Sequence, residues 1–422
     1  MNIWILNHYA VPPRYYYLAR AYHFAQKLME RGHRVTVFAG SSVHNSDVNL
    51  IEDGREYREL EDDGIRYVLF RGRTYAGSGK DRVINHIEVA RRMERLCPRL
   101  TNEYGMPDVI YASAGQTLTL LAGIRLARRF GVPCVCEVTD LWPESFVAYG
   151  LISRKNPLLR LLYSGERWIY KKADALIFSM EGGRDYILEK GWDTAHGGPV
   201  DLDKIYYINN GVDLALFDEQ AAQAPEDTYI TAPSVFKIVY AGSIRRVNDI
   251  HALLDSAAVL REKAPQCRIL VYGDGDERAA LAAKYAGLDN VRFMGRVAKN
   301  AIPAILTRAD VCFIDGCEGD GAEIARFGMS QNKIFEYLAA GRPIVFPVPG
   351  RYDLIGAHGC GFTVENEPEA VTEALLTLAQ SPSLCGQMGG AARRLAQEFD
   401  FNALTDKLCA VFERVREKHG RG

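Results

Sequence analysis

The chain has 422 residues, which is long enough for two domains with full hydrophobic cores. Its 48% hydrophobic and 25% charged residues are typical of a globular enzyme, and its net charge of −2 argues against a general nucleic-acid-binding protein. The nine cysteines show neither zinc-site spacing nor a secretory pattern, so we expect reduced, structural thiols.

The first residues, MNIWILNHYA, lack the basic segment that opens a signal peptide, and no run approaches the roughly 18 apolar residues of a membrane-spanning helix. We therefore expect a cytoplasmic protein. The segment 82–172 carries more Lys and Arg than Asp and Glu. Solvated helix faces explain this excess, although an anionic membrane surface or a lipid diphosphate would also be attracted by it.

The first half of the chain alternates short apolar runs with helical segments, a pattern that predicts a parallel sheet covered by helices on both faces. The predicted helices are one that ends at Arg31, then 82–100, 116–130 and one that ends at Lys172. The predicted strands are 2–7, 34–39, 65–70, 108–112, 132–138, 173–179 and 205–208.

The alternation stops at 214–234, a polar stretch with prolines that is typical of an interdomain linker or a surface excursion. It resumes with predicted strands at 236–241, 267–272, 291–294, 311–314 and 344–346. We predict an α/β protein with two doubly wound domains, at 1–215 and 235–395, joined by a linker at 216–234. A final helix at 396–422 is expected to pack back toward the N-terminal domain.

The most informative stretch, 327–347, reads as loop, helix, turn and buried strand. Ser330 is the predicted N-cap, and Gly341 ends the helix. Lys333, Glu336 and Tyr337 share the face opposite the apolar stripe. A diphosphate suits the free N–H groups of such a helix start, next to Lys333, and Glu336 could accept the hydroxyls of a ribose. An ordinary amphipathic helix is the alternative.

Other signals follow predicted strands, at the edge where parallel sheets bind ligands. Gly242 and Ser243, then Arg245 and Arg246, could approach and neutralise a phosphate. Gly273 opens a Gly-Asp-Gly-Asp run, which reads as a turn more readily than as a metal site. The backbone of Arg296 and Val297 could pair with a base edge.

In the first half, Glu137 and Asp140 lie at the end of the strand 132–138, where clustered carboxylates suggest a polar substrate. His8 follows the first strand, with Arg14 and Arg20 nearby. We assign His8, Arg14, Arg20 and Glu137 to the acceptor side. Helix capping near Pro143 is an equally good explanation for Asp140.

Taken together, the chain resembles the retaining GT-B glycosyltransferases of family four, and in particular the branch that builds bacterial O-antigen, capsule and exopolysaccharide, including N-acetylfucosamine transferases. The resemblance covers nearly the whole chain. It rests on the strings NHYAVPP, RGHRVTVFA, EVTDLWPESFVAYG, WIYKKADALIFSMEGG, INNGVDLALF, YAGSIRRVND, VYGDGDER and SQNKIFEYLAAGRPIV.

The resemblance implies two Rossmann-like domains that face each other across a cleft, with a nucleotide-sugar held mainly by the C-terminal one. Glu336 matches the second glutamate of the E-x7-E signature, which binds the ribose. Gly328 replaces the first glutamate, which leaves the donor sugar to the backbone of Met329 and Ser330 or to other residues. Asn332 and Lys333 complete the implied donor turn.

The resemblance also marks departures. Many relatives place an Arg and a Lys after the first C-domain strand, where this chain has Ser243 and Asn248, so Arg245 or Arg246 would substitute. Residues 14–20 replace the usual glycine-rich loop of the N-terminal domain. Asp140 stands where relatives place the His or Asp that faces the donor sugar.

We therefore expect a hexosyltransferase that moves a sugar, with retention, from a nucleotide diphosphate sugar to a hydroxyl acceptor. Asp140 and Glu336 are the expected catalytic residues. A UDP-sugar donor and a lipid-linked glycan acceptor follow from the resemblance, with peripheral attachment to the inner membrane face and no nucleic-acid partner. Because Lys333, an arginine and the helix start would neutralise the diphosphate, we expect neither a metal nor another cofactor.

Three alternatives stay open. A nucleotide-sugar epimerase of similar two-domain fold would act without an acceptor. An NAD-dependent oxidoreductase is disfavoured, because no G-x-G-x-x-G follows the first strand. The third is a non-catalytic binding protein with the same fold.

Overall fold

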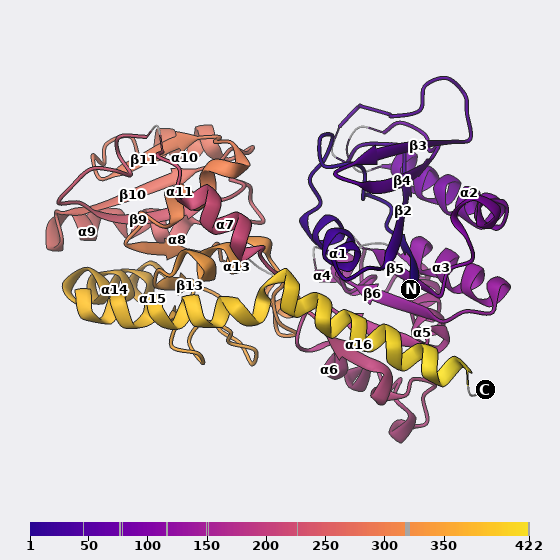
Figure 1. Cartoon of the computed structure of the whole chain (residues 1–422). Coiled ribbons are helices and arrows are strands. Elements are labelled where there is room, and N and C mark those ends of the chain that lie inside the picture. The colour runs from indigo at the N-terminus through magenta and orange to yellow at the C-terminus, as the bar shows by residue number, and fades with distance from the viewer. Residues whose placement is uncertain are drawn as a thin grey trace. The chain divides into compact units, whose positions relative to one another are not determined.

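The computed structural model describes residues 1–44, 46–75, 77, 79–114, 117–148, 150, 152–225, 227–316 and 321–420. It divides into two compact units (Figure 1). Unit 1 comprises Met1–Asn209 and Leu404–Gly422, and unit 2 comprises Asn210–Ala403. Over the described ranges, no helix has both the length and the apolar character needed to cross a membrane.

Unit 1 is built on an eight-stranded sheet in the order β3-β4-β2-β1-β5-β6-β7-β8. All neighbouring strands are parallel except β3, which runs antiparallel to β4 at the edge. The strands are β1 Asn2–Leu6, β2 Arg34–Gly40, β3 Tyr57–Asp62, β4 Ile65–Phe70, β5 Val109–Ala114, β6 Cys134–Val138, β7 Ala175–Phe178 and β8 Ile205–Tyr207.

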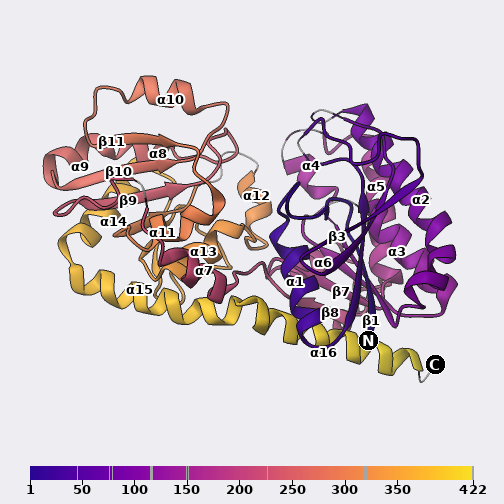
Figure 2. The same ribbon diagram turned by 45° about the horizontal axis from the view of Figure 1, so that its top comes forward.

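Helices cover both faces of this sheet: α2, α3 and α5 form one layer, and α1 lies on the other side (Figure 2). Helix α16 belongs to the same unit from Leu404 onward, where Tyr111 and Phe412 stack edge to face and Arg31 pairs with Asp406 at 2.6 Å. The helices are α1 Ala19–Glu30, α2 Lys80–Tyr104, α3 Thr117–Phe130, α4 Glu144–Ala148, α5 Pro157–Lys172, α6 Gly183–Glu189 and α16 Phe401–Gly420.

Unit 2 is built on a six-stranded, all-parallel sheet in the order β11-β10-β9-β12-β13-β14. Its strands are β9 Phe236–Ala241, β10 Cys267–Tyr272, β11 Val291–Gly295, β12 Val311–Phe313, β13 Ile344–Phe346 and β14 Gly361–Thr363. Its helices are α7 Leu214–Ala221, α8 His251–Asp255, α9 Ala257–Lys263, α10 Arg278–Lys284, α11 Ile302–Leu306, α12 Gly321–Ala325, α13 Asn332–Ala340, α14 Pro368–Gln380 and α15 Pro382–Ala396.

The polar stretch 216–234 packs onto unit 2. It includes most of α7, Ile230 is 1% exposed, and the Tyr272 hydroxyl donates to the Asp227 carboxylate next to β10. The stretch is therefore an excursion on the surface of unit 2. The predicted fold class, two doubly wound α/β domains, is confirmed.

Candidate functional site: a donor site in unit 2 and a polar cluster in unit 1

The start of α13 differs from the expected cap. The N-cap is Gln331, and it makes no side-chain capping bond. Ser330 Oγ is buried and finds no hydrogen-bond partner in the described structure, while the Ser330 carbonyl accepts from Asn210 Nδ2 at 2.6 Å. Gly341 ends the helix in the left-handed conformation, as predicted. The first N–H groups of α13 therefore have no side-chain cap, which leaves them available for an anion.

Lys333 points to the end of β9. A Cβ built on Gly242 would lie 2.9 Å from Lys333 Nζ, and Nζ also lies 3.4 Å from the Tyr240 hydroxyl. The ammonium pairs with Asp315, whose side chain is 0% exposed, and Asn248 Nδ2 donates to the same carboxylate at 2.7 Å. The sequence did not single out Asp315, although it directly follows β12 at the ligand-binding edge of the sheet. The positive charge of Lys333 thus lies beside Gly242 at the end of β9, the position where the sequence predicts a diphosphate.

Glu336 lies one turn further along α13. Lys299 Nζ donates to Glu336 Oε1 at 2.5 Å, and the Glu336 side chain is 19% exposed. Among the described residues, the second carboxylate oxygen has no hydrogen-bond donor, so it is open to a ligand. Lys299, from the segment after β11, was not predicted by the sequence analysis.

Tyr337 corrects the predicted helix face. It is fully buried, its hydroxyl accepts from the Ala241 backbone N–H at 2.8 Å, and it donates to the Ala241 carbonyl at 3.3 Å. The i, i+4 spacing from Lys333 could not distinguish a solvent-facing tyrosine from one that bonds the end of a neighbouring strand. Tyr337 therefore ties α13 to the last residue of β9.

Close backbone approach explains Gly273 at this edge. A Cβ on Gly273, whose φ is +134°, would lie 1.8 Å from the Gly242 carbonyl oxygen. The Gly242 N–H also donates to the Tyr272 carbonyl at 3.0 Å. The loops after β9 and β10 are thus held together. The remaining predicted donor residues line the same edge: Ser243, Arg245, Arg246, Arg296 and Asn332 are exposed, and Val297 and Met329 are half-buried.

In unit 1, Arg20 and Glu137, which were assigned to the acceptor side, are buried and pair with each other. Glu137 is 0% exposed and is bonded by Arg20 Nε at 2.9 Å, by Ser113 Oγ at 2.5 Å and by the Tyr111 hydroxyl. Arg20 also donates to the carbonyl of Asn209 at 2.5 Å. The hydrogen-bonding groups of the Arg20–Glu137 pair are therefore satisfied inside unit 1. Through Asn209, the pair also holds the end of the segment Met1–Asn209.

Arg14 does not join the other predicted residues either. Its guanidinium pairs with Asp62 at 2.9 Å on the edge strand β3. His8 is 1% exposed and stacks edge to face against Tyr9 and His86. His8 belongs to a polar cluster that contains two residues of α2, Arg82 and His86. From the sequence, these two residues were recognisable only as part of a predicted helix in a basic segment.

Asp140 is exposed at the end of β6 and lines a small cavity of about 10 Å³ with Thr117 and Trp142. Surrounding protein atoms raise the pKa of its carboxyl, and a hydrogen bond with Thr139 opposes the rise. Because the side chain is exposed, solvent screens this effect. Asp140 is close enough to Tyr9 for its charge to raise the pKa of the tyrosine hydroxyl.

The loop that carries Asp140 is anchored by Glu144. This buried carboxylate accepts from Lys190 Nζ and from the Tyr163 hydroxyl, both at 2.5 Å. Burial is the largest single influence and raises the pKa of Glu144, but the two bonds together with the charges of Lys190 and Arg154 outweigh it and lower the pKa. In the described residues, no group of three His, Cys, Asp or Glu side chains is placed to hold a metal ion.

Comparison with known proteins gives matches for both units. Residues 18–197 match the glycosyl transferase 4-like domain, and residues 235–381 match the glycosyl transferases group 1 domain. A GDP-mannose-dependent alpha-(1-6)-phosphatidylinositol dimannoside mannosyltransferase from Mycobacterium tuberculosis is 26% identical over 202 residues, 48% of this chain and 50% of the relative. The match to this relative thus spans half its length.

A D-inositol 3-phosphate glycosyltransferase from Streptomyces scabiei is 25% identical over 310 residues, 70% of this chain and 66% of the relative. The crystal structure of Anabaena Alr3699/HepE in complex with UDP shares the fold, with a TM-score of 0.66 at 17% identity over 98% of this chain and all of that one. Most of unit 1 thus matches a glycosyl transferase 4-like domain, most of unit 2 matches a glycosyl transferases group 1 domain, and the fold is that of GT-B glycosyltransferases.

Proposed function

We propose that the chain is a retaining glycosyltransferase that moves a sugar from a nucleotide diphosphate sugar to a hydroxyl acceptor. The observation that carries this proposal is the arrangement at α13: an uncapped helix start, the Lys333 ammonium beside Gly242, and Glu336 one turn later. Together they offer an anion site and a ribose acceptor at the carboxyl edge of a parallel sheet.

The chemistry needs stabilisation of a departing diphosphate and of an oxocarbenium-like sugar. Lys333, the N–H groups at the start of α13 and an exposed arginine at 245 or 246 would stabilise the diphosphate charge. These groups supply enough positive charge for the reaction to proceed without a metal. The acceptor oxygen attacks from the leaving-group side, and the diphosphate takes its proton. A double displacement would instead need a carboxylate nucleophile, for which Asp140 is the candidate.

A UDP-sugar donor is supported by the shared fold with a protein solved with UDP. A lipid-linked glycan of surface polysaccharide synthesis is the proposed acceptor, in keeping with the phosphatidylinositol dimannoside named for the mycobacterial relative. Transfer to such an acceptor would take place at the inner face of the cytoplasmic membrane, so we propose peripheral attachment of unit 1.

The outer face of α5 supports that attachment. Leu158 is 49% and Leu161 is 68% exposed, and exposed Arg160 and Arg167 lie on the same helix. Apolar and basic side chains together favour an anionic bilayer. Leu161→Asp should reduce flotation with phosphatidylglycerol vesicles, whereas Met106→Asp, a control at a 54% exposed position, should not. Equal flotation of both variants would contradict the attachment.

The reaction is tested with a panel of UDP- and GDP-sugars, each with and without a lipid diphosphate sugar acceptor. We expect nucleotide release that depends on the acceptor. Release of nucleotide and an altered sugar without acceptor would instead identify an epimerase. No release under any condition, with a folded protein, would indicate a binding protein and overturn the proposal.

A further inference from the structure

A cluster of rings in unit 1 lies between the end of β1, the loop after β2 and the start of α2. The Tyr9 hydroxyl bonds His86 Nε2 at 2.9 Å, and the His8 and His86 rings meet at 4.5 Å. His44 packs on Tyr9 with ring centroids 4.5 Å apart. Arg82 Nη2 donates to the Tyr9 hydroxyl at 3.0 Å. The cluster therefore gathers hydrogen-bonding groups around one guanidinium.

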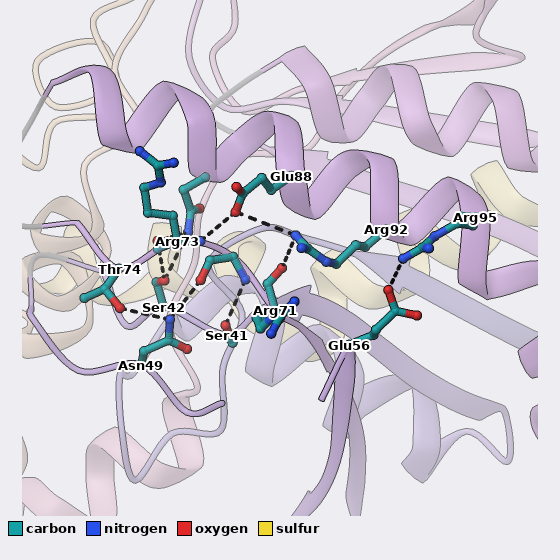
Figure 3. Close-up of polar contacts among 12 residues, drawn as sticks. Ser41, Ser42, Asn49, Glu56, Arg71, Arg73, Thr74, Glu88, Arg92 and Arg95 are labelled. Carbon is teal, nitrogen blue, oxygen red and sulfur yellow. Dashed lines mark hydrogen bonds and ion pairs between the residues drawn. The ribbon is translucent and has the colours of Figure 1, made fainter. Parts of the chain in front are cut away.

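Arg82 differs from three nearby arginines in its partners. Arg92 pairs with Glu88 at 3.6 Å and Arg95 pairs with Glu56 (Figure 3). Arg73, in the loop before α2, pairs with Asp81 at 2.7 Å. In contrast, no carboxylate among the described residues forms an ion pair with Arg82, whose one hydrogen bond is to Tyr9. Most of its N–H donors are therefore available to an anion.

The three histidines add no positive charge at neutral pH. Burial, followed by the Arg82 charge, lowers the pKa of His44 and of His86 to about 4. Burial and the neighbouring His86 lower the pKa of His8 well below its ordinary value. As neutral rings they can donate or accept hydrogen bonds without repelling a cationic neighbour. Arg82 is thus the positive charge of the cluster.

A buried donor in the same place lacks a partner. Tyr75 is 5% exposed, and its hydroxyl makes no hydrogen bond in the described part of the chain. Tyr75 follows Arg73 by two residues, and the Arg73 carbonyl accepts from Asn85 Nδ2 at 2.5 Å, one turn of α2 from Arg82. Burial is the main cause that raises the pKa of the Tyr75 hydroxyl, and the charges of Tyr9 and Arg82 also act on it. Buried polar groups are normally paired, so this hydroxyl is a candidate partner for a ligand.

The surrounding loop is held in place. Ser42 Oγ donates to the Arg73 carbonyl at 3.1 Å, and the Arg73 N–H donates to Glu88 at 2.9 Å (Figure 3). Asn49 Nδ2 donates to Thr74 Oγ1 at 3.1 Å. These bonds hold the segment directly before Tyr75 against α2 and against the loop after β2. The Tyr75 hydroxyl is thus positioned before any ligand binds.

We propose that Arg82, Tyr75 and the Tyr9–His86 pair form a subsite for a phosphate group carried by the acceptor. A guanidinium with free donors, a hydroxyl and a neutral imidazole match the oxygens of a phosphate ester, and no carboxylate of the cluster competes for Arg82. The inference rests on the proposed glycosyltransferase function and names the acceptor class as a phosphate ester, either lipid-linked or free.

The test compares wild type, Arg82→Gln, Arg82→Lys and Arg73→Gln. The acceptors are a short polyprenyl diphosphate sugar, the same sugar as its 1-phosphate, and the same sugar as a phosphate-free alkyl glycoside. Arg82→Gln should raise KM for both phosphorylated acceptors about 10- to 100-fold and leave KM for the alkyl glycoside unchanged. Arg82→Lys should lose less, and Arg73→Gln should match wild type. An effect on the diphosphate lipid alone would restrict the subsite to the lipid source.

Calorimetry with the sugar 1-phosphate, without donor, separates this inference from the proposed function. Binding by wild type that Arg82→Gln abolishes, without any transfer, would support the subsite and refute the function. Transfer with the same loss on phosphorylated and phosphate-free acceptors would refute the subsite and leave the function intact. If Arg82→Gln fails to fold by circular dichroism, Arg82→Lys decides: unchanged binding of the sugar 1-phosphate overturns the subsite.

Discussion

Replacing Lys333 with Met tests the ion pair on which the donor site is built. The Asp315 side chain is 0% exposed and that of Lys333 is 15% exposed. Without the ammonium, the carboxylate keeps Asn248 at 2.7 Å and Gln331 at 3.5 Å. Removing one partner of a buried pair costs about 3–5 kcal/mol, and the partial exposure of Lys333 places this case near 3 kcal/mol.

Lys333→Met should also weaken UDP binding, because a hydrogen bond from a charged donor to the diphosphate is worth about 1.5–3 kcal/mol, or roughly 10- to 100-fold in Kd. The double variant Lys333→Met/Asp315→Asn removes the unpaired carboxylate. It should recover most of the lost stability and none of the lost affinity. Stability and affinity are thereby separated.

Urea unfolding followed by circular dichroism measures the first effect, and titration calorimetry with UDP measures the second. The reasoning is refuted if Lys333→Met binds UDP as tightly as wild type. It is equally refuted if the double variant is no more stable than the single one, because the buried carboxylate would then not be the cause of the loss.

Glu336→Gln should weaken UDP binding by about 10-fold and 2′-deoxy-UDP binding by less, because the carboxylate accepts from the ribose hydroxyls. Equal losses of affinity for the two ligands in calorimetry would show that Glu336 does not bind the ribose. Tyr337→Phe leaves the buried Ala241 N–H without its acceptor at 2.8 Å and should cost about 1–3 kcal/mol in urea unfolding, whereas a cost near zero would contradict the role of this bond. His44 and His86 have folded pKa values of about 4, below the ordinary 6.5, so the unfolded chain binds protons more tightly. Their contribution to stability is complete above pH 6.5 and is lost as the pH falls toward 4, and His86→Gln should reduce this dependence in unfolding measured from pH 7 to 4. An unchanged pH profile in that variant would show that other groups cause the acid sensitivity.

The architecture was largely predictable from the sequence, because buried parallel strands are continuous apolar runs. The prediction missed two of the four edge strands, β3 and β14, for different reasons. β3 has the alternating polar pattern of a half-exposed strand, YRELED, and β14 has only three residues, Gly361–Thr363. Neither carries the apolar signal of a central strand.

The donor site was predictable where its residues are close together along the chain. Lys333 and Glu336 share one helix, and their spacing is visible in the sequence. Asp315 and Lys299, which pair with them, come from other segments, so only the fold brings them near. Ser330 fits the N-cap preference by residue type, but its hydroxyl is buried and Gln331 takes the position.

The acceptor side was harder to predict, because residues that are close together along the chain differ there in their burial. Glu137 and Asp140 are three positions apart, yet one is enclosed with Arg20 and the other is exposed. Arg82 stands out through its hydrogen bond to the Tyr9 hydroxyl, which also bonds His86, a property that three-dimensional contacts alone reveal.

The central claim, sugar transfer with retention, is tested most directly by identifying the product. Wild-type protein is incubated with a UDP-sugar and a lipid diphosphate sugar acceptor, and the product is analysed by mass spectrometry and by NMR of the new anomeric centre. We predict an acceptor that has gained one glycosyl residue with the anomeric configuration of the donor. An inverted linkage would contradict retention, and an unmodified acceptor beside an altered nucleotide-sugar would contradict transfer.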